Sequence, residues 1–270
     1  MLRNALLAAG LAIALNIAAA MGGLSYQACV VLVFGGMVAF FATNAWRVLS
    51  ADDWKLFAGF FLAGNIATTL LEIFMMRFDV WGFTSRTHHL SGYTIFGAPL
   101  EEYGYWACCA AIVPLAYLGF SRRQGPMRYD PAFLTSLEAF ADRLHLQAKT
   151  DPVAYVEESE GKEGQFARGS RFPVYICIQL AFVAAIAGLL RRYHGSWKAL
   201  VATVVVFSLV VFPNEAWSIH QGYWAYNSQK MVGIYFLHIP LEGWLMYFLP
   251  AVFACMVIDI ADRDIFGKDA

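Results

Sequence analysis

A proline followed by leucine and glutamate occurs twice in this chain, each time at the start of a long apolar run. The copies are Pro99-Leu100-Glu101-Glu102 and Pro240-Leu241-Glu242, and a glycine, Gly92 or Gly233, stands seven residues before each proline. A charged residue at the centre of a bilayer costs about 2.5–3.5 kcal/mol on insertion scales, so an acid inside an apolar run indicates a functional site. A carboxyl group there can hold a proton near neutral pH and act as a general acid.

A further glutamate stands upstream of each copy. Glu72 lies nine residues before Trp81, and Glu215 lies nine residues before Trp224. Acids at repeated positions exceed what interhelical hydrogen bonding alone would explain, and they predict a shared acid–base site. The candidate catalytic residues are therefore Glu72, Glu101, Glu102, Glu215 and Glu242.

Aromatic residues surround both motifs. Taken singly, each is typical of the aromatic belt at a membrane interface. Taken as a set beside acids, they can hold a cationic intermediate through cation–π attraction. The candidate substrate-binding residues are Trp81, Phe83, Tyr105, Trp224, Tyr226 and Trp244.

The composition places this site in a membrane. The chain of 270 residues is 59% hydrophobic and only 14% charged, which excludes an ordinary soluble domain. A helix of about 20 apolar residues crosses the hydrocarbon core of a bilayer. Apolar runs lie near residues 5–22, 28–47, 56–76, 95–119, 174–190, 198–213 and 236–258. We therefore predict an all-α membrane protein with about seven transmembrane helices.

The runs group into two repeats and three other segments. The predicted order is an N-terminal transmembrane helix (1–27), a three-helix repeat (28–120), a polar connector (121–172), a second three-helix repeat (173–260) and a polar tail (261–270). An amphipathic helix is expected in the connector at about 131–148, lying on the membrane surface or on neighbouring helices. With an odd number of spans per repeat and none in the connector, the two repeats are predicted to be inverted.

The same topology predicts the orientation. Lys and Arg number 12 on the N-terminal side and 7 on the other. The positive-inside rule then places the N-terminus and the 121–172 connector in the cytoplasm of a multi-pass cell-membrane protein.

The two motif runs are too long for one straight helix each. Proline disfavours helical geometry in the residue before it and is well tolerated in the first helical turn. We therefore expect the segments 92–98 and 233–239 to be irregular or re-entrant, with helices beginning at Pro99 and Pro240. Broken backbone at membrane depth is tolerated where it lines a protein-enclosed cavity, so both segments indicate one internal pocket.

Several other chemistries lack their motifs. The chain has no glycine-rich nucleotide-binding sequence and no Cys or His spacing typical of a metal site, so no cofactor and no metal is predicted. A net charge of −1 gives no indication of a nucleic-acid partner. The segment 99–102 is similar to the opening of the membrane CAAX-type protease motif, but that family has an arginine where this chain has Trp106.

The layout resembles the integral-membrane lycopene cyclase family. The resemblance is carried by the two motifs 99–102 and 240–242 and by the upstream segments 72–83 and 215–226. It implies two homologous three-helix units that act together, here fused in one chain and covering about 28–120 and 173–260. Gly243 stands where the first copy has its second glutamate, so the two copies are unequal.

The resemblance also implies a reaction. The substrate would be lycopene or a similar linear carotene in membrane lipid, acted on by a homo- or hetero-oligomer. Protonation of a terminal double bond would start closure of a β- or ε-ionone ring without net redox change. Glu101 or Glu102 would be the acid and Glu242 the complementary carboxylate. Glu72 and Glu215 would orient them or act as the base.

Two alternatives use the same residues. A carotenoid hydratase would quench the same cation with water. A proton-coupled carrier would use midplane acids on broken helices as coupling sites.

Overall fold

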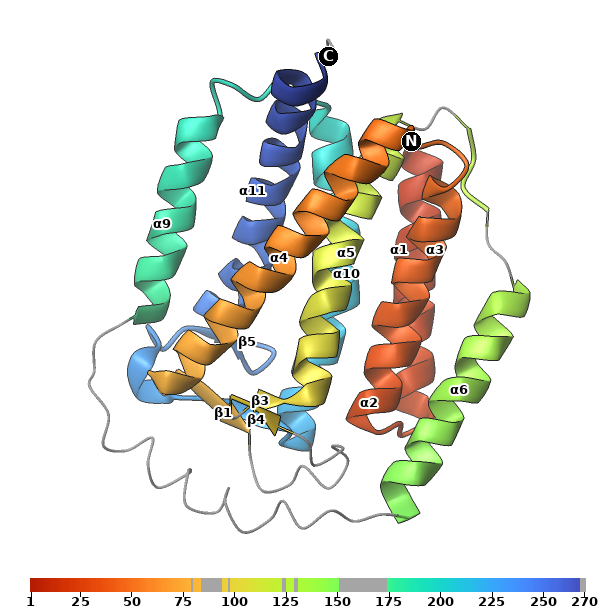
Figure 1. The fold of residues 1–270 in the computed structure, drawn as a ribbon. Coiled ribbons are helices and arrows are strands. Elements are labelled where there is room, and N and C mark those ends of the chain that lie inside the picture. Colours follow the sequence, from red (N-terminus) through yellow and green to blue (C-terminus); the bar gives the residue numbers. More distant parts are fainter. Residues whose placement is uncertain are drawn as a thin grey trace.

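The structure is a computed structural model, and it describes residues 1–78, 80–83, 94–96, 98–122, 125–128, 131–150 and 174–267. The first long helices are α1 (Leu2–Met21) and a composite of α2 (Tyr26–Cys29), a π-helical turn η1 (Val30–Gly35) and α3 (Gly36–Ala45). They are followed by α4 (Ala51–Arg77), α5 (Leu100–Arg122), α6 (Pro131–Thr150), α9 (Val174–Leu189), α10 (Trp197–Gln221) and α11 (Leu241–Phe266). The helices stand side by side in one bundle (Figure 1).

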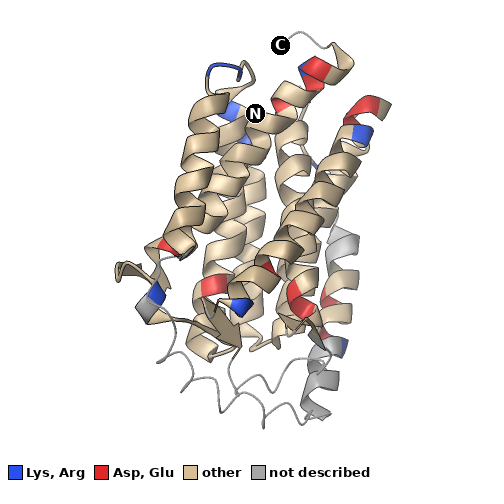
Figure 2. Ribbon diagram, turned by 60° about the vertical axis from the view of Figure 1, so that its left-hand side comes forward, with Lys and Arg blue, Asp and Glu red and all other residues tan. Residues whose placement is uncertain are grey.

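The described residues confirm an all-α membrane protein. Six helices are long and apolar enough to span a bilayer: α1, the α2–η1–α3 composite, α4, α5, α10 and α11. The seventh predicted span corresponds to α9, whose 16 residues reach about 24 Å at 1.5 Å per residue. In Figure 2 the ribbon segments of the described charged residues lie mainly toward the two ends of the bundle.

Short strands connect the helices at one end of the bundle. They are β1 (Trp81–Phe83), β2 (Thr94–Ile95), β3 (Ala98–Pro99), β4 (Trp224–Tyr226), β5 (Tyr235–Phe236) and β6 (Ile239–Pro240). Strands β2 and β3 form one hairpin and β5 and β6 another, and a single-turn 3₁₀ helix, η3 (Ser228–Lys230), follows β4. A pair of irregular segments ahead of the two prolines was predicted, and α5 and α11 do begin immediately after Pro99 and Pro240. Gly92 lies outside the described residues.

The prediction that the repeats are inverted is wrong. Strand β1 follows α4 and strand β4 follows α10, and these two strands are paired with each other. Helices α4 and α10 therefore end at the same end of the bundle, where α5 and α11 begin. The two repeats, α2–α5 and α9–α11, run in the same direction through the bundle (Figure 1).

The error arose in the connector, which was expected to stay on one side. Helix α5 ends at Arg122, which is bonded to the N-terminal turn of α4, whereas α9 begins near the strands, where Tyr175 stacks on Tyr226. The described residues that flank the connector, Arg122 and Val174, therefore lie at opposite ends of the bundle, which does not agree with a connector that stays on one side of the membrane. Helix α6 runs along the outside of the bundle between these levels, against α2 and η1 (Figure 1).

Helix α6 is amphipathic, as the sequence predicted for residues 131–148. Ala141 is buried against the bundle, whereas Glu138, Asp142 and Arg143 are exposed. The helix thus lies on neighbouring helices, one of the two placements expected of it. Helix α11 continues to Phe266, so the segment expected to be a polar tail begins as helix.

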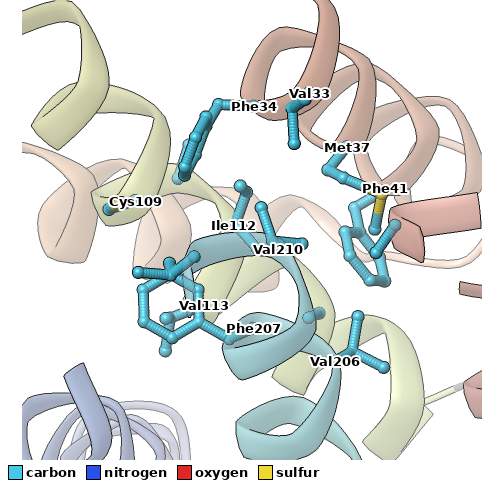
Figure 3. Close-up of a cluster of buried hydrophobic side chains, with 14 of the residues drawn as sticks. Val33, Phe34, Met37, Phe41, Cys109, Ile112, Val113, Val206, Phe207 and Val210 are labelled. Atoms are coloured by element: carbon cyan, nitrogen blue, oxygen red, sulfur yellow. The ribbon is translucent and has the colours of Figure 1, made fainter. Parts of the chain in front are cut away.

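The two repeats share one core rather than forming separate domains. Helix α5 packs against α10, and α11 packs against both α4 and α5. Figure 3 shows the centre of this core, where side chains from η1, α3, α5 and α10 meet. They include Val33, Phe34, Met37, Phe41, Cys109, Ile112, Val113, Val206, Phe207 and Val210. A site built between the repeats is therefore held by a common packed interior.

An ion cluster fixes the end of the bundle opposite the strands. The Arg122 guanidinium of α5 lies 3.2 Å from the Asp53 carboxylate of α4 and also binds Asp262 of α11. Both carboxylates are buried, with exposed fractions of 3% and 4%. This cluster ties together α4, α5 and α11, the three helices that form most of the groove described below.

Candidate active site

The upstream motifs of the two repeats meet directly in a two-stranded sheet. Trp81 is paired with Tyr226, Gly82 with Ala225 and Phe83 with Trp224. This antiparallel register exchanges equivalent positions of the two copies, so a local two-fold relation passes between Gly82 and Ala225. Sequence spacing alone did not show that the two Glu-to-Trp segments are in contact.

Glu72 is held behind this sheet by two indoles. Its side chain is buried, with an exposed fraction of 1%. Trp81 Nε1 donates to Glu72 Oε1 at 3.0 Å, and Trp106 Nε1 donates to Oε2 at 3.1 Å. Both oxygens of the carboxyl group are therefore engaged, and the two indole rings are fixed in orientation.

Glu215 occupies the equivalent position in the second repeat and has more donors. Trp224 Nε1 donates to Oε1 at 3.3 Å, and Tyr226 donates its hydroxyl to the same oxygen at 2.6 Å. Tyr247 donates its hydroxyl to Oε2 at 3.0 Å. Burial raises the pKa of the Tyr226 phenol well above its ordinary value, so this phenol remains a neutral donor.

The third buried acid is Glu102, in the first turn of α5. Its exposed fraction is 6%, and Tyr26 donates its hydroxyl to Glu102 Oε2 at 2.8 Å. The Tyr26 ring also lies edge-on to Trp224, with ring centroids 5.4 Å apart. Tyr26 thus connects the acid of the first repeat to the aromatic wall of the second. Ser25 begins α2 by accepting from Ala28 N, which sets the position of Tyr26.

Glu102 and Glu215 line the same internal cavity, which has a volume of about 20 Å³. Its other walls are Trp81, Phe83, Trp106, Tyr175, Trp224, Tyr226, Met246 and Tyr247. Glu72 lies immediately behind two of these walls, through its bonds to Trp81 and Trp106. Acids from both repeats therefore converge on one small chamber walled by aromatic rings.

Two of the predicted catalytic acids lie away from this chamber. Glu101 accepts from Gln27 Nε2 at 2.7 Å, and Glu242 accepts from the backbone N–H of Val232. Glu242 is fully buried, and its contact fixes the chain ahead of the β5–β6 hairpin. The structure therefore brings together Glu72, Glu102 and Glu215 and gives the other two acids contacts outside the cavity wall.

The aromatic predictions divide in the same way. Trp81, Phe83, Trp224 and Tyr226 line the cavity. Tyr105 packs instead on Phe34, with centroids 4.7 Å apart, and Trp244 donates its Nε1 to the hairpin carbonyl of Phe236 at 3.2 Å. These two side chains support the structure around the site without facing the cavity.

The sequence prediction omitted several residues of the wall. Trp106 and Tyr247 could have been found from the sequence, because each stands five residues after the motif glutamate of its repeat. In the structure each donates to the upstream glutamate of its own repeat. Tyr26 and Tyr175 open the first helix of each repeat, and only the packing of those helices reveals their role.

A comparison with protein-family models gives one relevant match. The model described as lycopene cyclase matches residues 24–120 and 173–260. The chain belongs to the lycopene cyclase family. The two matched segments coincide with the two repeats, and α1 and α6 lie outside them. Comparisons with curated proteins and with solved structures gave no match.

Proposed function

We propose that this lycopene cyclase family member closes the linear ends of lycopene, or of a similar linear carotene, by an acid-initiated reaction in the shared cavity. The observation that carries the proposal is the convergence of Glu102 and Glu215, from different repeats, on one aromatic chamber. An acid, a base and a water-poor aromatic pocket are what the cyclisation requires.

Glu102 is the proton donor in this mechanism. Three donors bind Glu215 and favour its carboxylate form, whereas among the described residues Glu102 receives one side-chain donor, from Tyr26. Two neighbouring acids in one apolar chamber do not both ionise readily, so a proton resides on the less supported one. Glu102 delivers this proton to the terminal double bond of the carotene.

The remaining steps balance without a redox partner. Protonation leaves a tertiary carbocation, and the neighbouring internal double bond attacks it to close the ring. The cation lies among the faces of Trp81, Trp224 and other cavity rings, which stabilise positive charge. Glu215 removes a proton from the ring carbons and returns it across the cavity to Glu102, so product and substrate have the same composition.

Glu72 acts as a positioning residue. It binds the indoles of Trp81 and Trp106, which are two walls of the chamber, and it does not line the chamber itself. Its ionised or neutral carboxyl can accept both N–H groups, so its contribution is the orientation of the two rings.

The distribution of the described basic residues supports an orientation with the start of α1 and the end of α11 on the cytoplasmic side. Those at the end opposite the strands are Arg3, Arg47, Lys55, Arg122, Arg128, Arg191, Arg192, Lys198 and Arg263. Among the described residues outside α6, the strand end has Arg77 and Lys230. The positive-inside rule then places the acid chamber toward the non-cytoplasmic half of the membrane.

The test is pigment analysis of a lycopene-accumulating bacterium that expresses the chain. We expect a product of unchanged mass whose absorption lies at shorter wavelength, and its chromatographic identity distinguishes β from ε rings. A mass gain of one water would overturn cyclisation in favour of a hydratase. Unaltered lycopene, with the protein present in the membrane, would contradict the proposed reaction and favour the carrier.

A further inference from the structure

A second, larger cavity adjoins the acid chamber on the side of α4. Its volume is about 360 Å³, and it lies between α4, α5 and α11, with contributions from α9 and α10. Three residues, Trp106, Met246 and Tyr247, line both this groove and the acid chamber. The two spaces are therefore neighbours separated by these three side chains.

The groove is apolar throughout its length. On α4 its wall consists of Phe60, Ala63, Gly64, Ala67, Thr68 and Leu71. The hydroxyl of Thr68 donates back to the carbonyl of Gly64 at 2.9 Å, so it offers no free donor to a ligand. A chain that enters this groove meets only hydrocarbon and aromatic surface.

The groove continues toward the opposite end of the bundle. A further hollow of about 220 Å³ shares Phe60 and Ala63 with it and reaches Lys55 on α4 and Ile265 on α11. From Leu71 to Lys55 the path along α4 measures about 24 Å at 1.5 Å per residue. With the acid chamber added, the path is comparable to the hydrocarbon thickness of about 30 Å.

The groove is open along one side. Ala63 and Ala67 are exposed at the bundle surface although they line the groove, and α4 as a whole is little buried. Gly64 allows α4 to approach α5 closely, because a Cβ at that position would lie 3.1 Å from Ala110 Cβ. A ligand can therefore enter sideways from the lipid without crossing an aqueous phase.

We propose that this groove holds the polyene chain of the carotene while one of its ends reaches the acid chamber past Met246. The inference rests on the proposed function and adds the subsite and the binding direction. Met246 is an unbranched, adaptable side chain between the two spaces, which suits it to move aside for the entering end. A rigid, straight polyene fits a straight apolar groove with little loss of conformational entropy. Because one chamber serves one groove, the two ends of a carotene are cyclised in separate binding events.

The first test blocks the groove beyond its midpoint. In the variant Ala63→Phe the new ring lies where the groove meets the far hollow, so a full-length carotene no longer fits. We expect KM for lycopene to rise about tenfold or more, which corresponds to about 1.4 kcal/mol of lost binding. A shortened apo-lycopenal that keeps one linear end should be cyclised at the wild-type rate. The matched control is Leu62→Phe, on the exposed face of α4, which should leave both substrates unaffected.

A second test reads binding without catalysis. In the variant Ala67→Cys, lycopene should slow alkylation of the new thiol, measured by peptide mass spectrometry, because the polyene covers it. The variant Ile66→Cys places a thiol outside the groove and should be alkylated at the same rate with or without lycopene.

The outcomes separate this inference from the proposed reaction. If Ala63→Phe converts lycopene at the wild-type rate, the proposed binding of the polyene in the groove is overturned, while the proposed cyclisation still stands. If Ala63→Phe loses activity on both substrates, the labelling experiment decides whether the groove binds the polyene. A thiol in Ala67→Cys that lycopene does not protect would overturn that role of the groove. Protection at Ala67→Cys in a protein that never converts lycopene would support the groove and contradict the proposed reaction.

Discussion

The two repeats contribute different groups to one cavity, and two pairs of positions bear directly on its acids. The first repeat has Phe83 and Glu102 where the second has Tyr226 and Gly243. A Cβ at Gly243 would lie 3.0 Å from the Tyr226 hydroxyl and 2.9 Å from an Ile239 methyl. The phenol of the second repeat therefore occupies space that a side chain at Gly243 would need.

This exchange explains how a duplicated scaffold becomes one asymmetric site. In the first repeat, a phenyl ring without a hydroxyl, Phe83, accompanies Glu102. In the second, the added hydroxyl of Tyr226 donates to Glu215 at 2.6 Å. In the proposed reaction, one copy would therefore supply the acid and the other the stabilised base.

The parts that remained equal are those that build the scaffold. Each upstream glutamate accepts from the tryptophan nine residues later, and each hairpin carbonyl accepts from a side chain eight residues later, Tyr103 to Ile95 and Trp244 to Phe236. The two repeats therefore share the frame of the site, whereas several groups that face the cavity differ between them.

The largest effect is expected from removing the proton carrier. Glu102→Gln should lower cyclisation at least about a hundredfold, the lower range for loss of a general acid. Glu101→Gln, one residue earlier and outside the cavity, should retain most activity. The amide oxygen of the new side chain can still accept the hydrogen bond from Gln27. The measurement is lycopene turnover in membranes with equal protein content. Equal losses in both variants would remove the distinction between the two adjacent acids.

The close approach of Tyr226 to Gly243 predicts that substitutions at these two positions have coupled effects on stability. Gly243→Ala should destabilise the protein by about 1–3 kcal/mol, because the new methyl group overpacks against Tyr226. Adding Tyr226→Phe removes the hydroxyl from that contact and should recover part of the loss. Thermal unfolding in detergent of the two single variants and the double variant measures the coupling. Strict additivity would show that the hydroxyl and the glycine are independent.

A smaller effect is expected at Tyr26, which supports Glu102. Tyr26→Phe deletes the donor at 2.8 Å and should lower kcat about tenfold with little change in KM, since a buried acceptor left without its donor costs about 1–3 kcal/mol. Tyr175→Phe is the comparison, because Tyr175 opens the corresponding helix of the second repeat and its ring stacks on Tyr226 at the other wall of the chamber. A loss confined to KM in Tyr26→Phe would mean that Tyr26 contacts substrate rather than positioning the acid.

The sequence indicated which residue types meet in the site, but not how they are arranged. Composition and apolar runs were sufficient for the helices, and matched glutamates were sufficient for an acidic centre between two repeats. The direction of the repeats depended on where the connector runs, and α6 carries too many charges for its course beside the bundle to be read from hydropathy. Choosing between Glu101 and Glu102 required knowing which of the two faces the second repeat. Successive residues of a helix point about 100° apart, and only the packing of α5 fixes the direction of each side chain. Tyr26 was invisible for the same reason.

The smallest expected effect tests whether the two hairpins are equally strained. Phe96 and Leu237 occupy equivalent turn positions with φ of 52° and 50°, a left-handed conformation that costs a residue with a side chain about 1–2 kcal/mol. Both side chains are mostly exposed, so Phe96→Gly and Leu237→Gly remove little packing. Each should stabilise the protein by up to about 1 kcal/mol, because relief of strain outweighs the added freedom of the unfolded chain. Thermal unfolding of both variants in the same detergent measures this. Equal gains in the free energy of unfolding would show that the two hairpins are as alike in strain as the rest of the shared frame. A gain in one variant alone would show that the repeats also differ in the hairpin that precedes α5 or α11.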